Sequence, residues 1–147
     1  MDINELSPLE VFSYFQEICA IPHGSGNTGM IADYCLEFAK LHGLKARKDT
    51  SDNVVIFKAG SSGYEDREPV ILQGHLDMVC EKQPDSDIDM SVQSIKACTD
   101  GKMVWADGTT LGADDGIAVA FILAVLASDT IAHPPIQAVL TLSLIHI

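Results

Sequence analysis

The sequence predicts an α/β protein in which helices flank a mixed β-sheet. Segments with a helical spacing of apolar residues alternate along the chain with short runs of strand-forming residues, which is the order typical of this class. The chain has 147 residues, of which 47% are hydrophobic, and this is enough to bury a sizeable core without disulfides or metals. Charged residues make up only 20%, so the composition excludes a largely disordered chain.

Two helices are predicted in the first third of the chain. Residues 7–10 (Ser-Pro-Leu-Glu) have the composition of a capping box with proline at the first helical position, and Pro22 prevents the first helix from continuing. A second helix is predicted over about 28–42, because apolar residues line one face and Gly43 is a natural stop.

The rest of the chain predicts mainly strands. A hairpin is expected over 92–106, with Asp100-Gly101 at its turn. A helix over 117–127 is apolar on nearly every side and is therefore expected to be buried. The apolar run at 70–72 is typical of a buried strand. The strands are expected at 44–49, 53–58, 70–72 and 136–142.

The charge balance bears on partners and location. With 9 Lys+Arg against 21 Asp+Glu, the formal net charge is -12, which argues against nucleic acid and anionic membranes as partners. The chain starts with acidic residues, and its longest apolar run is about half as long as a membrane-spanning helix. We therefore expect a cytoplasmic protein, with Cys19 and Cys35 as buried free thiols.

Two motifs match ligand-binding strings without the required context. Residues 24–29 (Gly-x-Gly-x-x-Gly) match a dinucleotide fingerprint, but they follow a helix instead of a strand, so a tight helix connector is favoured. Residues 85–89 (Asp-x-Asp-x-Asp) resemble the start of a calcium loop. Met90 and Lys96 occupy the positions where such a loop needs Gly and Glu, so a solvated acidic loop is favoured.

Two acidic clusters are better candidates for a site. His75-x-Asp77 ends a predicted strand, so the imidazole could bind a metal while the carboxylate orients it. The alternative is a strand-end histidine with a solubilising aspartate. Asp114 and Asp115 precede the apolar helix, where one could cap the helix and the other could bridge two metals.

These residues lie in two longer motifs that together resemble the M20 metallopeptidases. The motifs are 73–79 (Gln-Gly-His-Leu-Asp-Met-Val) and 107–118 (Asp-Gly-Thr-Thr-Leu-Gly-Ala-Asp-Asp-Gly-Ile-Ala). They are most similar to the branch of the cytosolic non-specific, or aminoacyl-histidine, dipeptidases (peptidase D), as is Ile-Pro-His at 21–23. The resemblance covers about residues 6–143. It implies that 1–147 is the N-terminal portion of a single zinc-peptidase catalytic domain, without the lid and dimerisation domain.

The resemblance also implies an activity and roles for particular residues. The family hydrolyses dipeptides, Xaa-His and others, using two zinc ions or other divalent metals that activate water and polarise the scissile carbonyl. His75 would ligate one zinc, Asp77 would be the catalytic-site residue that orients His75, and Asp114 would bridge the metals. The Asp114–Asp115 peptide bond is a candidate for the cis form. The full-length parent is expected to bind a dipeptide substrate and to form a homodimer.

The chain departs from the family pattern at its end. After Ser143 the family continues with two glutamates, one of which is the general base, and here Leu144 and Ile145 stand in their places. The family's remaining metal ligands come later still. We therefore expect the chain as written to be inactive and the tail 143–147 to be an unnatural continuation.

Two alternatives remain open at this stage. One is another M20 activity, namely an aminoacylase or carboxypeptidase acting on a small N-acyl substrate. The other is a non-catalytic binding fragment that uses the sheet as a surface. A truncated catalytic domain predicts an exposed apolar sheet edge and aggregation, whereas a genuine short binding protein predicts a monodisperse chain.

Overall fold

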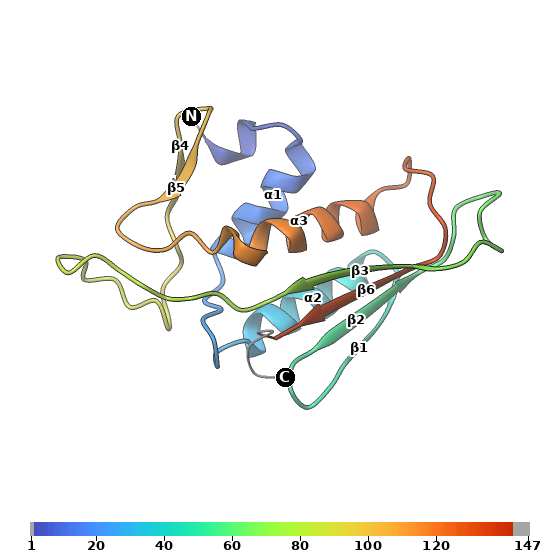
Figure 1. The fold of residues 1–147 in the computed structure, drawn as a ribbon, viewed down its shortest axis with the longest axis horizontal. Coiled ribbons are helices and arrows are strands. Elements are labelled where there is room, and N and C mark those ends of the chain that lie inside the picture. The colour runs from blue at the N-terminus through green and yellow to red at the C-terminus, as the bar shows by residue number, and fades with distance from the viewer. Residues whose placement is uncertain (1, 143–147) are drawn as a thin grey trace.

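A four-stranded mixed sheet forms the centre of the molecule. The computed structural model describes residues 2–142, and the strands of its main sheet have the order β1-β2-β6-β3 (Figure 1). β3 and β6 are parallel, and the other neighbours are antiparallel, so the predicted mixed sheet is confirmed. The strands are β1 (Lys45–Lys48), β2 (Val54–Lys58), β3 (Val70–His75) and β6 (Ile136–Thr141).

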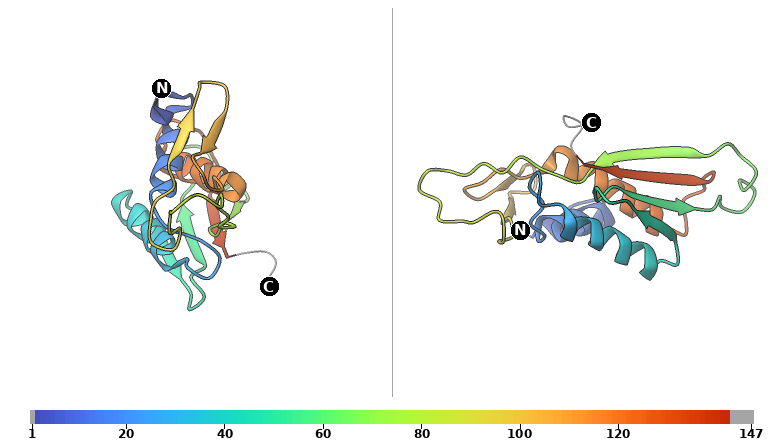
Figure 2. Two further views of the ribbon diagram at one scale, coloured as in Figure 1. Left: turned by 90° about the vertical axis from the view of Figure 1, so that its left-hand side faces the viewer. Right: turned by 90° about the horizontal axis from the view of Figure 1, so that it is seen from below.

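Helices pack on one face of this sheet (Figure 2). Helix α2 (Gly29–Leu41) contacts β1 and β2, α3 (Ala113–Ala127) contacts β3, and α1 (Leu9–Cys19) packs against α3. A short 3-10 turn, η1 (Ile3–Glu5), precedes α1 and contacts a separate hairpin of β4 (Ala97–Thr99) and β5 (Val104–Ala106). None of the helices within 2–142 has the length and apolarity needed to cross a membrane.

The core lies between the sheet and the helices. Alternate residues of β2 and β6 point toward the helices and are buried, while their neighbours are half-buried on the other face. The buried positions are Val54, Ile56, Ile136, Ala138 and Leu140.

The predicted thiols belong to this helix-covered core. Cys19 and Cys35 are free and buried, as expected, and burial raises the pKa of each thiol to about 12. Both thiols therefore act as small apolar groups.

The start of α1 differs from the prediction. The helix begins at Leu9 with Pro8 in the N-cap position, and no side chain makes a capping hydrogen bond. Because the helix starts one residue later than a Ser7 cap requires, Ser7 is not in the cap position. The backbone N–H of Phe12 donates to the Pro8 carbonyl at 3.2 Å, which is a regular α-helical hydrogen bond.

The prediction that residues 70–72 form a buried strand is wrong in part. The strand is present, but Val70 is 43% exposed and Ile71 is 65% exposed. The reason is that β3 is the edge strand of the sheet within 2–142 and no helix of that range covers the face to which Ile71 points. The expected departure at Leu144 and Ile145, with the rest of the tail 143–147, lies outside the described residues.

Candidate functional site

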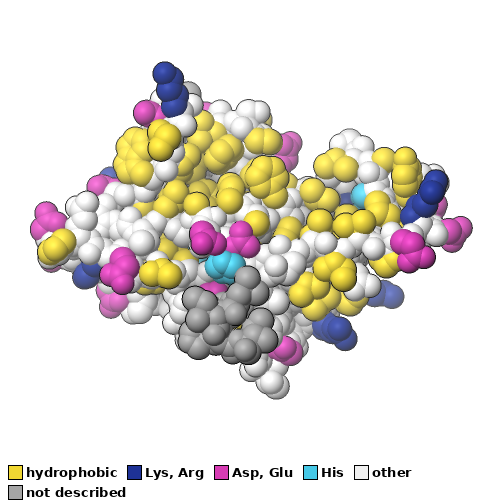
Figure 3. Space-filling model, in the orientation of Figure 1, with side chains coloured by type: hydrophobic (Ala, Val, Ile, Leu, Met, Phe, Trp, Pro, Cys, Tyr) yellow, Lys and Arg dark blue, Asp and Glu magenta, His cyan; other side chains and the backbone are white. Residues whose placement is uncertain are grey.

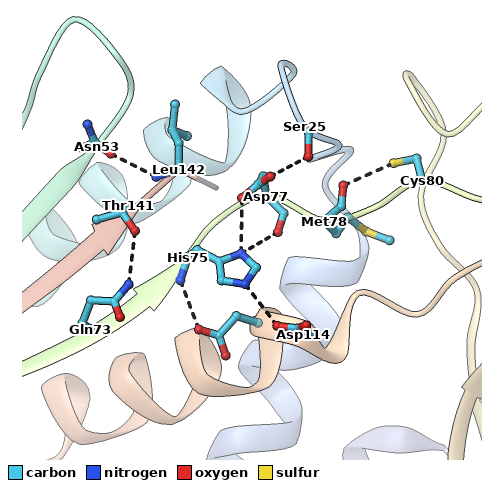
Figure 4. Close-up of polar contacts among 11 residues, drawn as sticks. Ser25, Asn53, Gln73, His75, Asp77, Met78, Cys80, Asp114, Thr141 and Leu142 are labelled. Carbon is cyan, nitrogen blue, oxygen red and sulfur yellow. Dashed lines mark hydrogen bonds and ion pairs between the residues drawn. The ribbon is translucent and has the colours of Figure 1, made fainter. Parts of the chain in front are cut away.

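His75 stands at the carboxyl end of β3, beside the carboxyl end of β6. The two strands are parallel, and His75 pairs with Thr141 in the last register position of each. Open α/β sheets place ligand groups at this end of parallel strands. Gln73 donates from Nε2 to Thr141 Oγ1 at 3.2 Å, which links the two strand ends side by side (Figure 4).

The imidazole of His75 lies between two aspartates. Its Nδ1 is 3.0 Å from the backbone carbonyl oxygen and 3.2 Å from Oδ1 of Asp77, and its Nε2 is 3.1 Å from Oδ1 of Asp114. Asp77 is almost fully buried, whereas the side chain of Asp114 is 97% exposed. The structure therefore brings together the three residues singled out from the sequence, with the buried carboxylate on the Nδ1 side of the ring and the exposed one on the Nε2 side (Figure 4). In the space-filling view, a histidine side chain lies at the surface beside acidic side chains (Figure 3).

The entry to α3 places Asp114 against the end of β3. Gly112 has a φ of 73°, and a Cβ atom there would lie 2.7 Å from the sulfur of Met78, so only glycine suits this close approach. Asp114 has a non-helical backbone, with φ -94° and ψ 101°. The Asp114–Asp115 peptide bond is cis, as the resemblance implied.

Asp115 braces the strand against the helix. The backbone N–H of His75 donates to Asp115 Oδ2 at 3.1 Å. A Cβ atom on Gly74 would lie 3.2 Å from the same oxygen, so the glycine allows the carboxylate to approach the strand. The alternative that one of the two aspartates caps the helix is not found, because Gly112 is the N-cap and no side chain makes the capping bond.

Three functional contacts were missed by sequence reasoning. Beside the brace made by Asp115, Ser25 donates its hydroxyl to Asp77 Oδ2 at 2.5 Å. Thr110 donates to the carbonyl of Val79 at 2.7 Å and accepts from the N–H of Glu81 at 3.2 Å, which joins the two long motifs. Each contact joins residues far apart in sequence, so no local pattern indicates it.

The two aspartates change the proton affinity of His75. Burial by itself would lower the pKa of His75, but the hydrogen bonds to Asp114 and to the Asp77 backbone, together with the charges of Asp115 and Asp77, outweigh it and raise the pKa above 6.5. In contrast, burial lowers the pKa of His23, whose Nδ1 lies 2.5 Å from the Ile21 carbonyl oxygen. At His75 the acidic neighbours outweigh burial, whereas at His23 burial outweighs the charge of Asp77.

The donor atoms of His75 and Asp114 fit a metal ion. A neutral imidazole carries a proton on only one of its two nitrogens. A ring with acceptor atoms against both nitrogens must therefore carry a proton on each, or hold a metal ion between one nitrogen and its acceptor. Nitrogen and carboxylate oxygen are among the ligands that zinc prefers. Two donors do not complete a zinc site, and residues 2–142 hold no group of three or more His, Cys, Asp or Glu side chains placed to bind a metal.

A cavity of about 600 Å³ lies elsewhere, between the start of α1 and the end of α3. Its lining includes Val11, Phe121, Val125 and Ile131, and none of the candidate residues. Catalytic chemistry needs polar groups that converge on a reacting atom. The candidate site is therefore the open surface around His75 and not this cavity.

Comparison with known proteins shows which proteins this chain is similar to. The chain is 41% identical over 142 residues to a cytosol non-specific dipeptidase of Escherichia coli, a match that includes 97% of the chain and 29% of the relative. No family model matches.

Solved structures agree with this match. An aminoacylhistidine dipeptidase from Vibrio alginolyticus has a TM-score of 0.95 and 42% identity, over 98% of this chain and 29% of the other. A tripeptidase from Staphylococcus aureus has a TM-score of 0.72 and 25% identity, over 93% and 37%. The chain therefore spans about 29% of the length of these two dipeptidases, and over nearly all of its own length it is similar to the cytosol non-specific dipeptidase and the aminoacylhistidine dipeptidase.

Proposed function

We propose that this chain is the N-terminal part of the catalytic domain of an M20-type di-zinc dipeptidase. His75 would be a ligand of one zinc ion, Asp114 would be a ligand shared by both ions, and Asp77 would orient His75. The observation that carries the proposal is the convergence of His75 Nε2 and Asp114 Oδ1, 3.1 Å apart at the carboxyl end of β3, with Asp77 behind the ring. The zinc ions, when bound, activate a water molecule and polarise the scissile carbonyl.

The chain's own residues prepare the site for the metal. Asp77 lies against His75 Nδ1 with its backbone carbonyl at 3.0 Å and its carboxylate at 3.2 Å, which would keep the ring proton on Nδ1 and leave the Nε2 lone pair directed toward Asp114. Asp115 fixes the backbone of His75 to the start of α3, so the ligands on the strand and on the helix hold their separation. The buried position of Asp77 keeps this pairing away from competing water.

We propose that the remaining parts of the site come from the part of the parent protein that corresponds to the relatives' sequence outside the matched stretch. The relatives are more than three times as long as the matched stretch, since the chain spans 29% of them. Because β6 ends beside His75, the segment that follows β6 in a relative enters at the same end of the sheet. We place the general base and the other ligands there, and we expect the 147-residue chain alone to be inactive.

The substrates, partners and location of the parent belong to the same proposal. We propose that the parent hydrolyses dipeptides, including Xaa-His, in the cytoplasm and acts as a homodimer. Both dipeptidase relatives support a dipeptide over the N-acyl amino acid of an aminoacylase. The carboxylates of Asp77 and Asp114, on the two sides of the His75 ring, support a metal-assisted hydrolysis over a metal-free one.

A chimera tests the proposal directly. Residues 1–142 of this chain replace the matched stretch of the Escherichia coli dipeptidase, and the purified protein is assayed with zinc on Xaa-His dipeptides and on N-acetyl amino acids. We expect dipeptide hydrolysis that His75→Ala and Asp114→Asn abolish and that Asp77→Asn lowers by about 10- to 100-fold. Asp85→Asn, in the acidic loop away from the site, is the control and should leave the rate unchanged.

Three outcomes would contradict parts of the proposal. Full activity in a folded His75→Ala chimera would remove the ligand role of His75. Hydrolysis of N-acetyl amino acids without dipeptides would favour the aminoacylase alternative. A folded chimera that binds zinc but hydrolyses neither class would favour the non-catalytic alternative.

A further inference from the structure

The connector between α1 and α2, residues 22–27, lies against the segment that follows His75. Ser25 donates its backbone N–H to the Met78 carbonyl at 3.1 Å, and Met78 donates its N–H to the His23 carbonyl at 3.1 Å. These bonds form a short parallel bridge between Gly24 and Met78. The backbone of the connector is therefore fixed next to Asp77.

This bridge places the Ser25 hydroxyl on the Asp77 carboxylate. Ser25 Oγ donates to Asp77 Oδ2 at 2.5 Å, and Figure 4 shows the two side chains pointing toward each other. The other oxygen, Oδ1, lies 3.2 Å from His75 Nδ1 as an ion pair and makes no hydrogen bond within the described part of the chain, while Nδ1 itself is 3.0 Å from the Asp77 backbone carbonyl. The serine therefore satisfies one carboxylate oxygen and leaves the other facing the imidazole.

We propose that Ser25 is a positioning residue that sets the orientation of the Asp77 carboxylate and, through it, the tautomer and ring orientation of His75. A carboxylate held by one partner can rotate about its Cβ–Cγ bond, and a second hydrogen bond removes that freedom. The metal-binding part of this inference rests on the proposed function, while the effect on the free imidazole does not.

The expected effect on zinc affinity depends on how many contacts separate Ser25 from the ligand His75. Removing the partner that hydrogen-bonds a metal-binding histidine typically lowers metal affinity by about 10- to 100-fold. Ser25 acts one step further out, on that partner, and the Asp77 backbone carbonyl still faces Nδ1 at 3.0 Å. We therefore expect Ser25→Ala to weaken zinc binding at His75 by about 3- to 10-fold, below the range for the partner itself.

The first experiment uses the zinc-free chain of 147 residues. The ¹⁵N and ¹H resonances of the His75 ring are recorded by NMR at a pH where the ring is neutral, for the wild type and for variants. We expect the wild type to show the Nδ1–H tautomer and Ser25→Ala to show a mixture of both tautomers. Ser25→Thr keeps the hydroxyl and, because residue 25 is exposed, has room for the extra methyl group, so it should restore the wild-type spectrum.

The second experiment adds zinc to the same samples. The His75 resonances report binding at this ring alone, separately from the other histidines. We expect Ser25→Ala to raise the apparent Kd for zinc and Ser25→Thr to leave it near the wild-type value. The matched control is Ser91→Ala, which removes a 2.6 Å hydroxyl–carboxylate bond to Asp89 while keeping the Ser91 carbonyl that Asn27 contacts, and it should change neither readout.

The outcomes separate this inference from the proposed function. Wild-type tautomer and zinc affinity in a folded Ser25→Ala chain would overturn the positioning role. A His75 ring that does not respond to zinc in any variant would contradict the metal site, while the tautomer result would still decide the role of Ser25. If Ser25→Ala does not fold, Ser25→Cys replaces it, since the thiol keeps the shape and is a weak donor; a wild-type spectrum and Kd in that variant would overturn the role as well.

Discussion

The two faces of the main sheet share the same strands but differ in what covers them. On the covered face, Val54, Ile56 and Leu140 meet the helices and are fully buried. On the opposite face, which we call the open face, the alternating residues are half-buried or exposed, and Ile71 is 65% exposed. The open face comprises Lys45, Arg47, Val55, Phe57, Ile71, Gln73, Gln137, Val139 and Thr141.

The open face carries a cluster of apolar side chains, which a fully solvated sheet face would replace with polar ones. Val55, Phe57, Ile71 and Val139 lie on neighbouring strands, and the Arg47 guanidinium lies 5.8 Å from the centre of the Phe57 ring. A sheet buried on both faces needs apolar residues at every position, whereas one that is half-solvated alternates apolar with polar. With apolar side chains on neighbouring strands of both faces, the main sheet is closer to the pattern of a sheet buried on both faces.

The largest expected effect comes from the covered face. Leu140→Ala should lower the free energy of unfolding by about 2–5 kcal/mol, because it leaves a cavity among fully buried side chains. Ile71→Ala, on the open face, should lower it by about 0.5 kcal/mol or less. Urea denaturation followed by circular dichroism measures both. Equal losses of unfolding free energy in the two variants would show that the open face is packed in solution, and would contradict the difference between the two faces.

The contact between β3 and α3 should give the next largest effect. A Cβ atom at Gly74 would lie 3.2 Å from Asp115 Oδ2 and 3.4 Å from a methyl carbon of Val119. Gly74→Ala should therefore lower the free energy of unfolding by about 1–3 kcal/mol, as overpacking does. The neighbouring Gln73→Ala, on the open face, is the control and should change it by about 0.5 kcal/mol or less. Wild-type stability in Gly74→Ala would mean that α3 moves away from the strand without cost.

The open face should also control association between chains. An apolar, unpaired edge strand promotes pairing with another chain, and a lysine on that edge opposes it. We expect the wild-type chain to elute above its monomer mass in size-exclusion chromatography with light scattering. Ile71→Lys should shift it toward the monomer. Leu41→Lys makes the same change on an exposed residue of α2 and should have no such effect; a monodisperse wild-type monomer would contradict the expectation.

The same contrast explains which features the sequence could predict. The helices and strands follow from periodicity and from breakers such as Pro22 and Gly43, which act locally. The exposure of Val70 and Ile71 could not be predicted, because an apolar run has the same composition whether its neighbours are present or not. Burial of such a strand depends on elements far along the chain.

The contacts of the candidate site can also be divided into those that the sequence indicated and those that it did not. His75, Asp77 and Asp114 lie in two long motifs that resemble the M20 metallopeptidases, so the resemblance indicated them, and the structure brings them together. The contact of Ser25 with Asp77 spans 52 residues, and that of Asp115 with the His75 backbone spans 40. A serine in a glycine-rich connector already has a local explanation as a turn residue. Its second role becomes visible only when the connector is placed against the strand.

The smallest expected effect concerns the two histidines nearest Asp77. Burial lowers the pKa of His23 below 6.5, although the Ile21 carbonyl and the Asp77 charge oppose it. The unfolded chain then binds a proton more readily than the folded chain, so the contribution of His23 to stability is present above pH 6.5 and is lost as the pH falls toward its folded pKa.

His75 has the opposite sign, since its folded pKa lies above 6.5 despite the burial that would lower it. Its contribution is present below pH 6.5 and is lost as the pH rises through the folded pKa. NMR titration of the histidine rings of the zinc-free chain should give a midpoint below 6.5 for His23 and above 6.5 for His75. Asp114→Asn should move only the His75 midpoint downward, because Asp114 lies against His75 Nε2 and not against His23. Equal midpoints for the two rings would mean that the buried connector and the exposed strand end do not differ electrostatically.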